Sequence, residues 1–392
     1  MPSSAAAAST SEATPAAAVK ELCATLQGQL GADPVDLCVA FVGARHAAQA
    51  AEVTAGLRAA LRPRVLVGVT TAGAIADAQE FETPEVSAAW AARLPGVDLT
   101  PLRYAAPSTE GATEPATLAT AGLWQPPPPA ADAIVVLADP FSMPVDTLID
   151  WLDEVGDGAA IAGGLASGAR EPGEVRLLLD GAVHTDGAVA VALEGVRVDT
   201  LVSQGCAPIG QSYVVTRASH NLLEEIGGAA PLDRLSELYA AAGPAEREAM
   251  AAGVHLGVVI DEYQEAFGRG DFLIRSVLGT PRGSQALLVG DHIAVGQTVQ
   301  FHVRDAVSAD EDLQTLLEGL PPDRAVIGGL LFTCNGRGRN LFTEPHHDAG
   351  LIHRALDGGA LAGCFCAGEV GQIGGRTFLH GFTASLLVLS AR

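Results

Sequence analysis

The chain has few basic residues for its length, and this scarcity limits its partners. Its 392 residues include 23 Lys and Arg against 46 Asp and Glu, which gives a formal net charge of −23. A surface that binds nucleic acid needs clustered basic side chains to displace counterions from the phosphates, and the sequence contains no such cluster. We therefore expect neither a nucleic acid nor an anionic membrane surface as a partner.

The sequence also lacks a hydrophobic run that could cross a membrane. No stretch without Asp, Glu, Lys or Arg is longer than Pro115–Ala131. This stretch contains Pro115 and the proline run 126–129, a density that a membrane-spanning helix does not tolerate. We expect a soluble protein without a membrane span.

Cysteine is sparse and irregularly spaced, which is not typical of a secreted disulfide scaffold. Reduced thiols in a reducing compartment are expected. Residues 1–18 have neither the basic start nor the apolar core of a secretory signal, and we predict that they form a disordered tail. The predicted location is cytoplasmic. The plastid stroma is the alternative, because the Ser, Thr and Ala content of residues 1–18 is typical of a transit peptide.

The remaining chain is apolar enough to bury a large core, with 48% hydrophobic residues and a mean hydropathy of +0.27. Short apolar runs alternate with segments of helical periodicity, and several strands follow one another across turns. These patterns predict a mixed α/β (α+β) fold of two related domains, 19–200 and 201–392, with largely antiparallel sheets covered by helices. Within them, Pro-rich residues 105–131 are predicted to be a surface insertion, and Leu222–Ile226 to be helical.

Two distant segments share a pattern. AAIAGGLASG at 159–168 and AVIGGLLFTCNG at 325–336 both run from an apolar strand into Gly-Gly-Leu and a polar loop. An internal duplication would produce this similarity and would place the two loops in comparable positions. Chance similarity over so few residues is the alternative.

The loop after the second of these strands, Thr333–Asn340, carries two arginines among glycines. Glycines let backbone N–H groups approach a ligand, and a guanidinium binds a carboxylate through two parallel hydrogen bonds. The sequence therefore predicts an anion-binding loop with Arg337, Arg339 and Asn340 as ligand-binding residues. The alternative is an ordinary turn whose arginines are solvated or paired with carboxylates of this acidic protein.

A second glycine-rich loop, 363–375, contains one carboxylate, Glu369. If Glu369 faces Arg337 or Arg339, the two loops present opposite charges and would bind a zwitterion such as an amino acid. An internal Arg–Glu pair is the competing interpretation. His380 lies just beyond this loop in the sequence, and we include it among the predicted ligand-binding residues.

Cys364 and Cys366 precede that carboxylate, and on a strand their side chains point to the same face. With Cys334, His346 or His347 they could form a soft metal site. The sequence nevertheless lacks the two separated C-x-x-C pairs that are typical of zinc sites. We predict no metal site and assign Cys364 and Cys366 to the ligand-binding set.

No motif indicates catalysis. A nucleophile built from Cys206, His380 and Glu369 can be drawn, but nothing in the neighbouring sequence specifies it. Walker, nucleophile-elbow and dinucleotide-binding motifs are absent. We predict that the protein is not an enzyme and has no catalytic residues.

The segment Leu331–Leu386 resembles the C-terminal domain of the FIST family through CNGRGRNLF, EPHHD and GCFCAGEVGQIGGRTFLHGFTAS. Other segments of the second half fit the same domain: GCAPIG at 205–210, YVVTRASHN at 213–221, DFLIRSVLG at 271–279 and GQTVQFHVRDAVSADEDL at 296–313. The first half is similar to the FIST N-terminal domain through GVTTAGAI at 68–75, LPGVDL at 94–99 and GGLASG at 163–168.

The resemblance implies a sensory module that binds a small ligand. FIST domains occur fused to signalling outputs in bacteria and to F-box segments in eukaryotes. Amino acids were proposed as ligands, and some bacterial members are haem-based nitric oxide sensors. The similarity runs from about residue 35 to the end and leaves no room in this chain for an output domain, so a protein partner is expected. One departure is Gln372, where relatives usually have proline.

These observations predict a non-enzymatic sensory protein that binds an amino acid or a small carboxylate-like ligand and acts in signalling through a protein partner. The sequence does not identify a cofactor. A haem-based gas sensor and a protein–protein assembly factor without a ligand are the alternatives.

Overall fold

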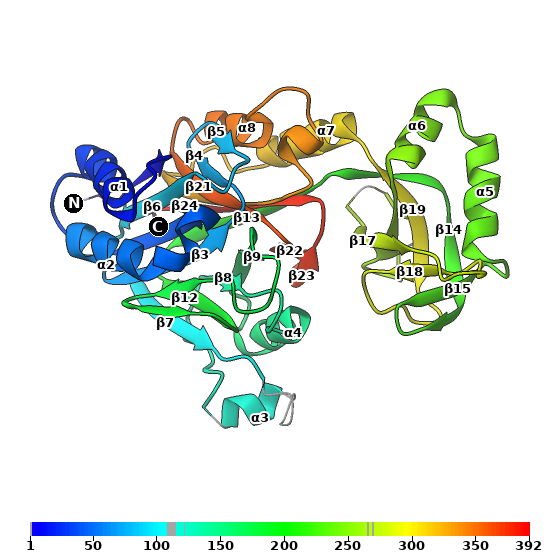
Figure 1. Ribbon diagram of the computed structural model, residues 1–392, viewed down its shortest axis with the longest axis horizontal. Coiled ribbons are helices and arrows are strands. Elements are labelled where there is room, and N and C mark those ends of the chain that lie inside the picture. Colours follow the sequence, from blue (N-terminus) through cyan, green and yellow to red (C-terminus); the bar gives the residue numbers. More distant parts are fainter. Residues whose placement is uncertain (1, 108–114, 121, 265, 269) are drawn as a thin grey trace. The chain divides into compact units, whose positions relative to one another are not determined.

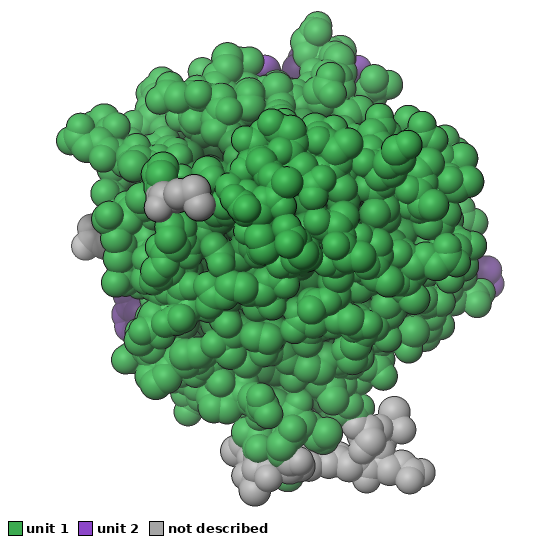
Figure 2. Space-filling model, turned by 90° about the vertical axis from the view of Figure 1, so that its left-hand side faces the viewer, with its two compact units in different colours: residues 1–202, 314–379, 383–392 green, residues 203–313, 380–382 purple. Residues whose placement is uncertain are grey.

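The computed structural model describes residues 2–107, 115–120, 122–264, 266–268 and 270–392. The chain divides into two compact units, coloured separately in Figure 2: the first unit comprises residues 1–202, 314–379 and 383–392, and the second comprises 203–313 and 380–382. The first unit contains three six-stranded sheets, and the second contains a closed barrel. The mixed α/β class, the largely antiparallel sheets and the presence of two domains are therefore confirmed.

Each sheet of the first unit has two parallel strands at its centre and antiparallel strands outside them. The first sheet has the order β1 (Ser4–Thr10), β6 (Ser87–Arg93), β2 (Leu37–Gly43), β3 (Val65–Thr71), β10 (Leu177–Leu179) and β11 (Ala182–His184). The second has the order β23 (Arg376–His380), β22 (Glu369–Ile373), β9 (Ala160–Leu165), β8 (Ala133–Ala138), β12 (Ala188–Glu194) and β7 (Asp98–Tyr104). The third has the order β13 (Arg197–Gln204), β24 (Thr383–Ser390), β20 (Val326–Cys334), β21 (Ala360–Cys366), β4 (Ala74–Ala76) and β5 (Gln79–Phe81).

Helices connect and cover these strands. They are α1 (Pro15–Leu30), the 3₁₀ helix η1 (Ala44–Gln49), α2 (Ala50–Leu61), α3 (Pro115–Thr120), α4 (Val145–Val155), the 3₁₀ helix η2 (Gly338–Asn340) and α8 (His347–Ala355). Helix α7 (Ala306–Glu318) begins in the second unit and ends in the first. The central parallel strands read as unbroken apolar runs, and every residue of β2, β3 and β8 is buried. That pattern follows from covering a parallel sheet on both faces.

The barrel of the second unit has the strand order β14 (Cys206–Ser219), β15 (Leu222–Ile226), β18 (Leu287–Val289), β17 (Phe272–Gly279), β16 (Val254–Val259) and β19 (Thr298–Arg304). Two helices, α5 (Pro231–Ala241) and α6 (Pro244–Ala252), belong to the same unit. The helix predicted at Leu222–Ile226 is wrong. This segment is strand β15, whose backbone pairs with β14 on one side and β18 on the other. Tertiary strand pairing overrides so short a local preference.

The first unit repeats one motif three times: a strand, a helix, a second strand parallel to the first, a hairpin, and a third strand antiparallel to the first. The first repeat is β2-α2-β3 with hairpin β4–β5 and third strand β6. The second is β8-α4-β9 with hairpin β10–β11 and third strand β12. The third is β20-α8-β21 with hairpin β22–β23 and third strand β24.

Each repeat donates its hairpin to the sheet of another repeat. Hairpin β4–β5 pairs with β21, hairpin β10–β11 with β3, and hairpin β22–β23 with β9. Two outer strands are exchanged as well: β7 follows the first repeat and pairs with β12 of the second, and β13 follows the second and pairs with β24 of the third. Strand β1 precedes the first repeat and pairs with β6 of that repeat. Figure 1 shows the consequence: α2, α8 and α4 lie on three different sides of the first unit. The exchange makes the three repeats one interlocked core.

The observed repeat does not match the predicted duplication, because the two similar segments do not correspond to each other within it. Segment 159–168 contains β9, the second strand of its repeat, whereas segment 325–336 contains β20, the first strand of its own. The two segments therefore occupy different positions in the motif. The division near residue 200 also differs from the compact units, because residues after 313 return to the first unit and pair with its sheets.

The prediction that residues 1–18 form a disordered tail is wrong, because most of these residues belong to a strand and a helix. Strand β1 pairs with β6 over seven residues, and α1 begins at Pro15. Ala6, Ala7 and Ala8 are buried. Ala6 and Ala8 pack in the cluster that includes α1, and Ala7 packs in the core on the opposite face of the sheet, so small side chains suit both faces of β1. Composition alone could not reveal this, because the strand exists only through its partner.

The predicted surface insertion at 105–131 falls partly on residues 108–114 and 121, which lie outside the described residues. Of the rest, Trp124 is fully buried, and its Nε1–H donates to the carbonyl of Ala105 at 2.9 Å. Its ring contacts Tyr104 and Trp151. This part of the segment therefore packs on the second sheet.

Across the described residues, the longest helices are too short or too polar to cross a bilayer.

We expect Ala7→Glu to lower the free energy of unfolding of the first unit by more than about 2 kcal/mol, because it buries an uncompensated carboxylate beside Trp90. All three tryptophans lie in the first unit, so urea unfolding followed by tryptophan fluorescence reports on it. Pro2→Glu, at an exposed position, is the control. Equal stability of the two variants would contradict the placement of β1 in the core.

Candidate functional site

The first predicted loop does not present Arg337 to solvent. This side chain is completely buried and forms two hydrogen bonds with Asp348 in the first turn of α8. Nε donates to Oδ2 at 2.6 Å and Nη2 donates to Oδ1 at 2.9 Å. Burial alone would raise the pKa of the Asp348 carboxyl, but the charge of Arg337 and the hydrogen bond with His347 hold this pKa well below its usual range.

Aromatic contacts fix the same loop. The Phe342 ring stacks on His347, with ring centroids 3.5 Å apart and 11° between the planes. The guanidinium of Arg337 lies over Phe342 at 5.4 Å, and His347 Nδ1 lies 3.0 Å from Asp348 Oδ1. Residues 337–348 are therefore tied together by one buried ion pair and one stacked pair.

The second loop places Glu369 at the start of β22, also completely buried. Its Oε2 accepts hydrogen bonds from the Thr383 amide at 3.2 Å and the Thr383 hydroxyl at 2.9 Å. Among the described residues, Oε1 has no hydrogen-bond partner. Burial raises the pKa of Glu369 to about 8, although Thr383, the charge of Arg337 and the Cys334 thiol act in the opposite direction. The positive charge of Arg337 thus acts on the pKa of the carboxyl in the other loop.

Glu80 in β5 is a second buried carboxyl of this cluster, which sequence reasoning missed. Its Oε1 accepts the Ala349 amide at 2.9 Å, at the start of the same helix that carries Asp348. Burial raises the pKa of Glu80 to about 7, and repulsion from Asp348 adds to the effect. The sequence around Glu80 is a polar hairpin, so no local signal indicated that the side chain turns inward.

The remaining predicted residues differ in burial and in the unit to which they belong. Arg339 and Asn340 are exposed; the Arg339 amide donates to Glu82 Oε1 at 2.9 Å, and Asn340 Nδ2 donates to the carbonyl of Asn335 at 2.9 Å. His380 is buried and belongs to the second unit, whereas the others belong to the first.

Cys364 and Cys366 lie in β21 and point into the apolar core beside Leu330 and Phe332. Their Sγ atoms are 3.5 Å apart, and both thiols are free. Burial raises the pKa of the Cys366 thiol well above its usual value, which leaves little reactive thiolate. Within the described ranges, His, Cys, Asp and Glu form no group of three or more suited to a metal ion.

Comparison of the chain with known proteins identifies its family and several relatives. The model of the FIST N domain matches residues 36–229, and that of the FIST C domain matches residues 231–372. The chain belongs to the FIST family. Two uncharacterised proteins of Mycobacterium tuberculosis are each 38% identical to it, one over 375 residues, with 94% of this chain and 95% of the relative covered, and one over 372 residues, with 94% of each covered.

An uncharacterised protein of Mycobacterium bovis is likewise 38% identical over 372 residues, with 94% of each chain covered. FIST domains are associated in general with sensory binding of small ligands in signalling and are generally regarded as ligand-binding modules rather than enzymes. Both family segments contribute to the buried cluster of this FIST protein: Glu80 comes from the N domain, and Arg337, Asp348 and Glu369 come from the C domain.

We expect Arg337→Ala to lower the free energy of unfolding by about 3–5 kcal/mol, because it leaves Asp348 buried without its counterion. The double variant Arg337→Met with Asp348→Leu removes both charges and should recover most of this loss. Urea unfolding monitored by tryptophan fluorescence measures both. Arg339→Ala, at an exposed site, should change stability by less than about 0.5 kcal/mol. A loss for Arg337→Ala as small as this control would refute the buried pair.

The raised pKa of Glu369 predicts a pH dependence of stability. Its folded pKa of about 8 lies above the unfolded value of about 4.3, so the folded state binds more protons between these limits. Stability should therefore fall as the pH rises from about 5 to 8. Glu369→Gln should flatten this slope, whereas Glu85→Gln, at an exposed carboxyl, should not. Parallel stability curves for wild type and Glu369→Gln would count against a buried, protonated Glu369.

Proposed function

We propose that this FIST protein is a non-enzymatic sensor of a small ligand that carries an ammonium and a carboxylate, such as an amino acid, and that the ligand acts on the buried cluster around Glu369. The observation that carries the proposal is the Glu369 carboxyl: it is completely buried, Oε1 lacks a hydrogen-bond partner among the described residues, and its pKa is raised to about 8. A ligand ammonium would satisfy this oxygen and favour the ionised form.

The loop that holds Arg337 is where we propose that the carboxylate of the ligand binds. Because Asp348 already occupies Nε and Nη2 of Arg337, we assign this guanidinium a positioning role that shapes the loop. The exposed Arg339 and Asn340 would receive the ligand carboxylate. Cys364 and Cys366 would form an apolar wall. His380, predicted from the sequence as a ligand-binding residue, belongs to the second unit, and we assign it no role in this site.

Two further features support a sensor that works through a partner. The buried thiols with raised pKa values are poor nucleophiles, which favours binding over catalysis. The net charge of −23 favours a protein partner with a basic surface and disfavours nucleic acid. All six cysteines are free, which fits the cytoplasm that we propose as its location.

The test is thermal unfolding, followed by tryptophan fluorescence, with the twenty amino acids, small carboxylates and haem as separate probes. A ligand that binds only the folded state stabilises it by about 2.7 kcal/mol at 100 times its Kd. We expect one amino acid or small carboxylate to raise the melting temperature of wild type. The shift should be lost in Glu369→Gln and kept in the control Glu85→Gln, whose carboxyl is 60% exposed.

Two outcomes would overturn the proposal. If haem alone shifts the melting temperature and gives a Soret band, the protein is a haem-based sensor and the amino-acid site is wrong. If no probe shifts a cooperative transition, the ligand class is wrong and assembly with a protein remains as the function.

A further inference from the structure

The three repeats create three comparable junctions in the first unit, and the chain fills them differently. At each junction, the segment after the first strand of one repeat meets the second strand or hairpin of another. The loop after β20 meets hairpin β4–β5 through the Arg339 amide and Glu82 and through the Glu80 amide and His346 Nδ1. The helix after β8 meets hairpin β22–β23 through Asp153 and Thr377.

Side chains occupy both of these junctions. At the first, Arg337 and Asp348 form their buried ion pair beside Glu80. At the second, Leu148, Val370 and Leu379 belong to one apolar cluster. Each junction is thus closed from within the chain, one by charge pairing and the other by apolar packing.

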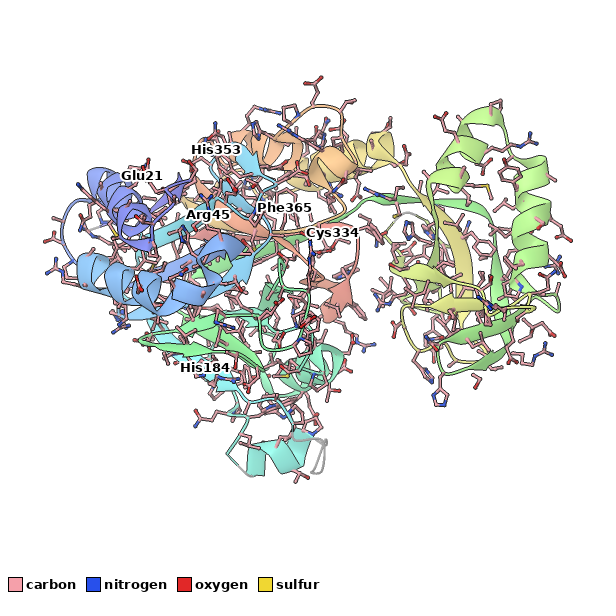
Figure 3. The ribbon with its side chains drawn as sticks, viewed as in Figure 1. Glu21, Arg45, His184, Cys334, His353 and Phe365 are labelled. Carbon is pink, nitrogen blue, oxygen red and sulfur yellow. The ribbon has the colours of Figure 1, made fainter. Side chains whose placement is uncertain are left out.

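At the third junction, α2 contacts hairpin β10–β11 through Arg58 and Asp180 at 3.1 Å, but the part beside η1 is open. There, η1 after β2 approaches the ends of β3 and β9, and a cavity of about 300 Å³ lies between them. Its lining includes Arg45, Arg176, Thr70, Ser167 and Ala47 (Arg45 is labelled in Figure 3). Besides Arg45, η1 contributes Ala44, Ala47 and Ala48 to the lining, and none of these three side chains is charged.

Two guanidinium groups give this cavity its charge. Nη1 of Arg176 donates only to the backbone carbonyls of Gly173 at 2.6 Å and Val175 at 2.8 Å. No carboxylate oxygen of a described residue lies within 4.0 Å of its guanidinium nitrogens. Arg45 contacts Glu85 at 3.3 Å, a pair exposed enough for an incoming anion to compete with it.

One carboxylate, Glu174, also lines the cavity, but its oxygen is held by its own loop. Oε2 accepts the amides of Arg170 at 2.8 Å and Glu171 at 3.2 Å. These bonds and the nearby arginine charges lower the pKa of Glu174, so it stays ionised in that position. It orders the loop that carries Arg176, and it does not form an ion pair with that arginine.

Hydrogen bonds make the wall of the cavity rigid before any ligand arrives. The Arg176 amide donates to Thr70 Oγ1 at 3.0 Å, and the Thr70 amide donates to the Arg176 carbonyl at 3.0 Å. Ser167 Oγ accepts the Ala72 amide at 2.8 Å and donates to the Phe365 carbonyl. A wall that is already ordered loses little conformational entropy on binding.

We propose that this cavity, between η1 and the ends of β3 and β9, is a binding site for a small oxyanion, a carboxylate or a phosphate, held by Arg45 and Arg176. The guanidinium fork matches both groups bidentately. In the protein's own charged junction, a carboxylate of the chain neutralises the guanidinium; in this junction, the anion comes from outside. The site uses none of the residues proposed for the amino-acid sensor, so either proposal can fail alone.

The experiment titrates wild type with succinate and, separately, with inorganic phosphate at constant ionic strength, and measures the melting temperature by tryptophan fluorescence. We expect a saturable rise for at least one of them, and the more effective probe identifies the head group. Arg176→Gln should raise the apparent Kd at least about tenfold, because it removes a charge-assisted contact. Arg45→Gln should act in the same direction.

Ala47→Glu is the sharper variant, because it places a carboxylate of the chain in the cavity that Arg45 and Arg176 line. It should abolish the saturable rise while the protein remains folded. Ala51→Glu, which adds the same charge at an exposed position of α2 outside the cavity lining, should keep the rise. Glu369→Gln should also keep it, even though it removes the amino-acid response.

Three results would overturn the site. One is a rise that follows ionic strength and does not saturate. Another is a saturable rise that survives both Ala47→Glu and Arg176→Gln. The third is a rise that is lost in Glu369→Gln but kept in Ala47→Glu, which would place the anion at the other cluster.

Discussion

The structure of the first unit depends on hydrogen bonds between the ends of the second strands of its three repeats. The Leu165 amide donates to the Gly368 carbonyl at 2.8 Å, and the Ala367 amide donates back to Leu165 at 3.2 Å. The Phe365 amide donates to the Gly73 carbonyl at 3.0 Å. The Ser167 hydroxyl bridges Ala72 and Phe365, and this completes the contacts among the repeats. These bonds bring the three second strands to one place, from which each hairpin leaves for another sheet.

Glycine makes the parallel pairing of the first and second strands within each repeat sterically possible. At Gly68, Gly163 and Gly363, one in each second strand, a Cβ would lie 2.5, 1.8 and 1.8 Å from a carbonyl oxygen of the adjoining parallel strand. Real atoms do not approach so closely, so any larger residue would push the parallel strands apart. The same convergence defines the junctions, one of which holds the buried Arg337 pair and another the open cavity lined by Arg45 and Arg176.

The sequence singles out Arg337 and Glu369 because both lie in or beside short, glycine-rich loops after apolar strands. The positive charge of Arg337 does act on Glu369, since it lowers the pKa of that carboxyl. Their burial could not be predicted, because Asp348 approaches from helix α8 and Glu80 from hairpin β4–β5, which is more than 250 residues away in the sequence. The choice between an ion pair within the chain and an exposed clamp depended on Asp348, which is eleven residues from Arg337 and carries no local motif.

By itself, the sequence determined the family, the mixed α/β class and the apolar strands, because local periodicity and motif spacing carry that information. Only the tertiary structure decided that the alanine run at 6–8 is a buried strand, that Leu222–Ile226 joins a barrel, and that three repeats exchange hairpins. Each of these depends on a backbone partner distant in the chain. Strand pairing between such distant segments satisfies hydrogen bonds that no local pattern records.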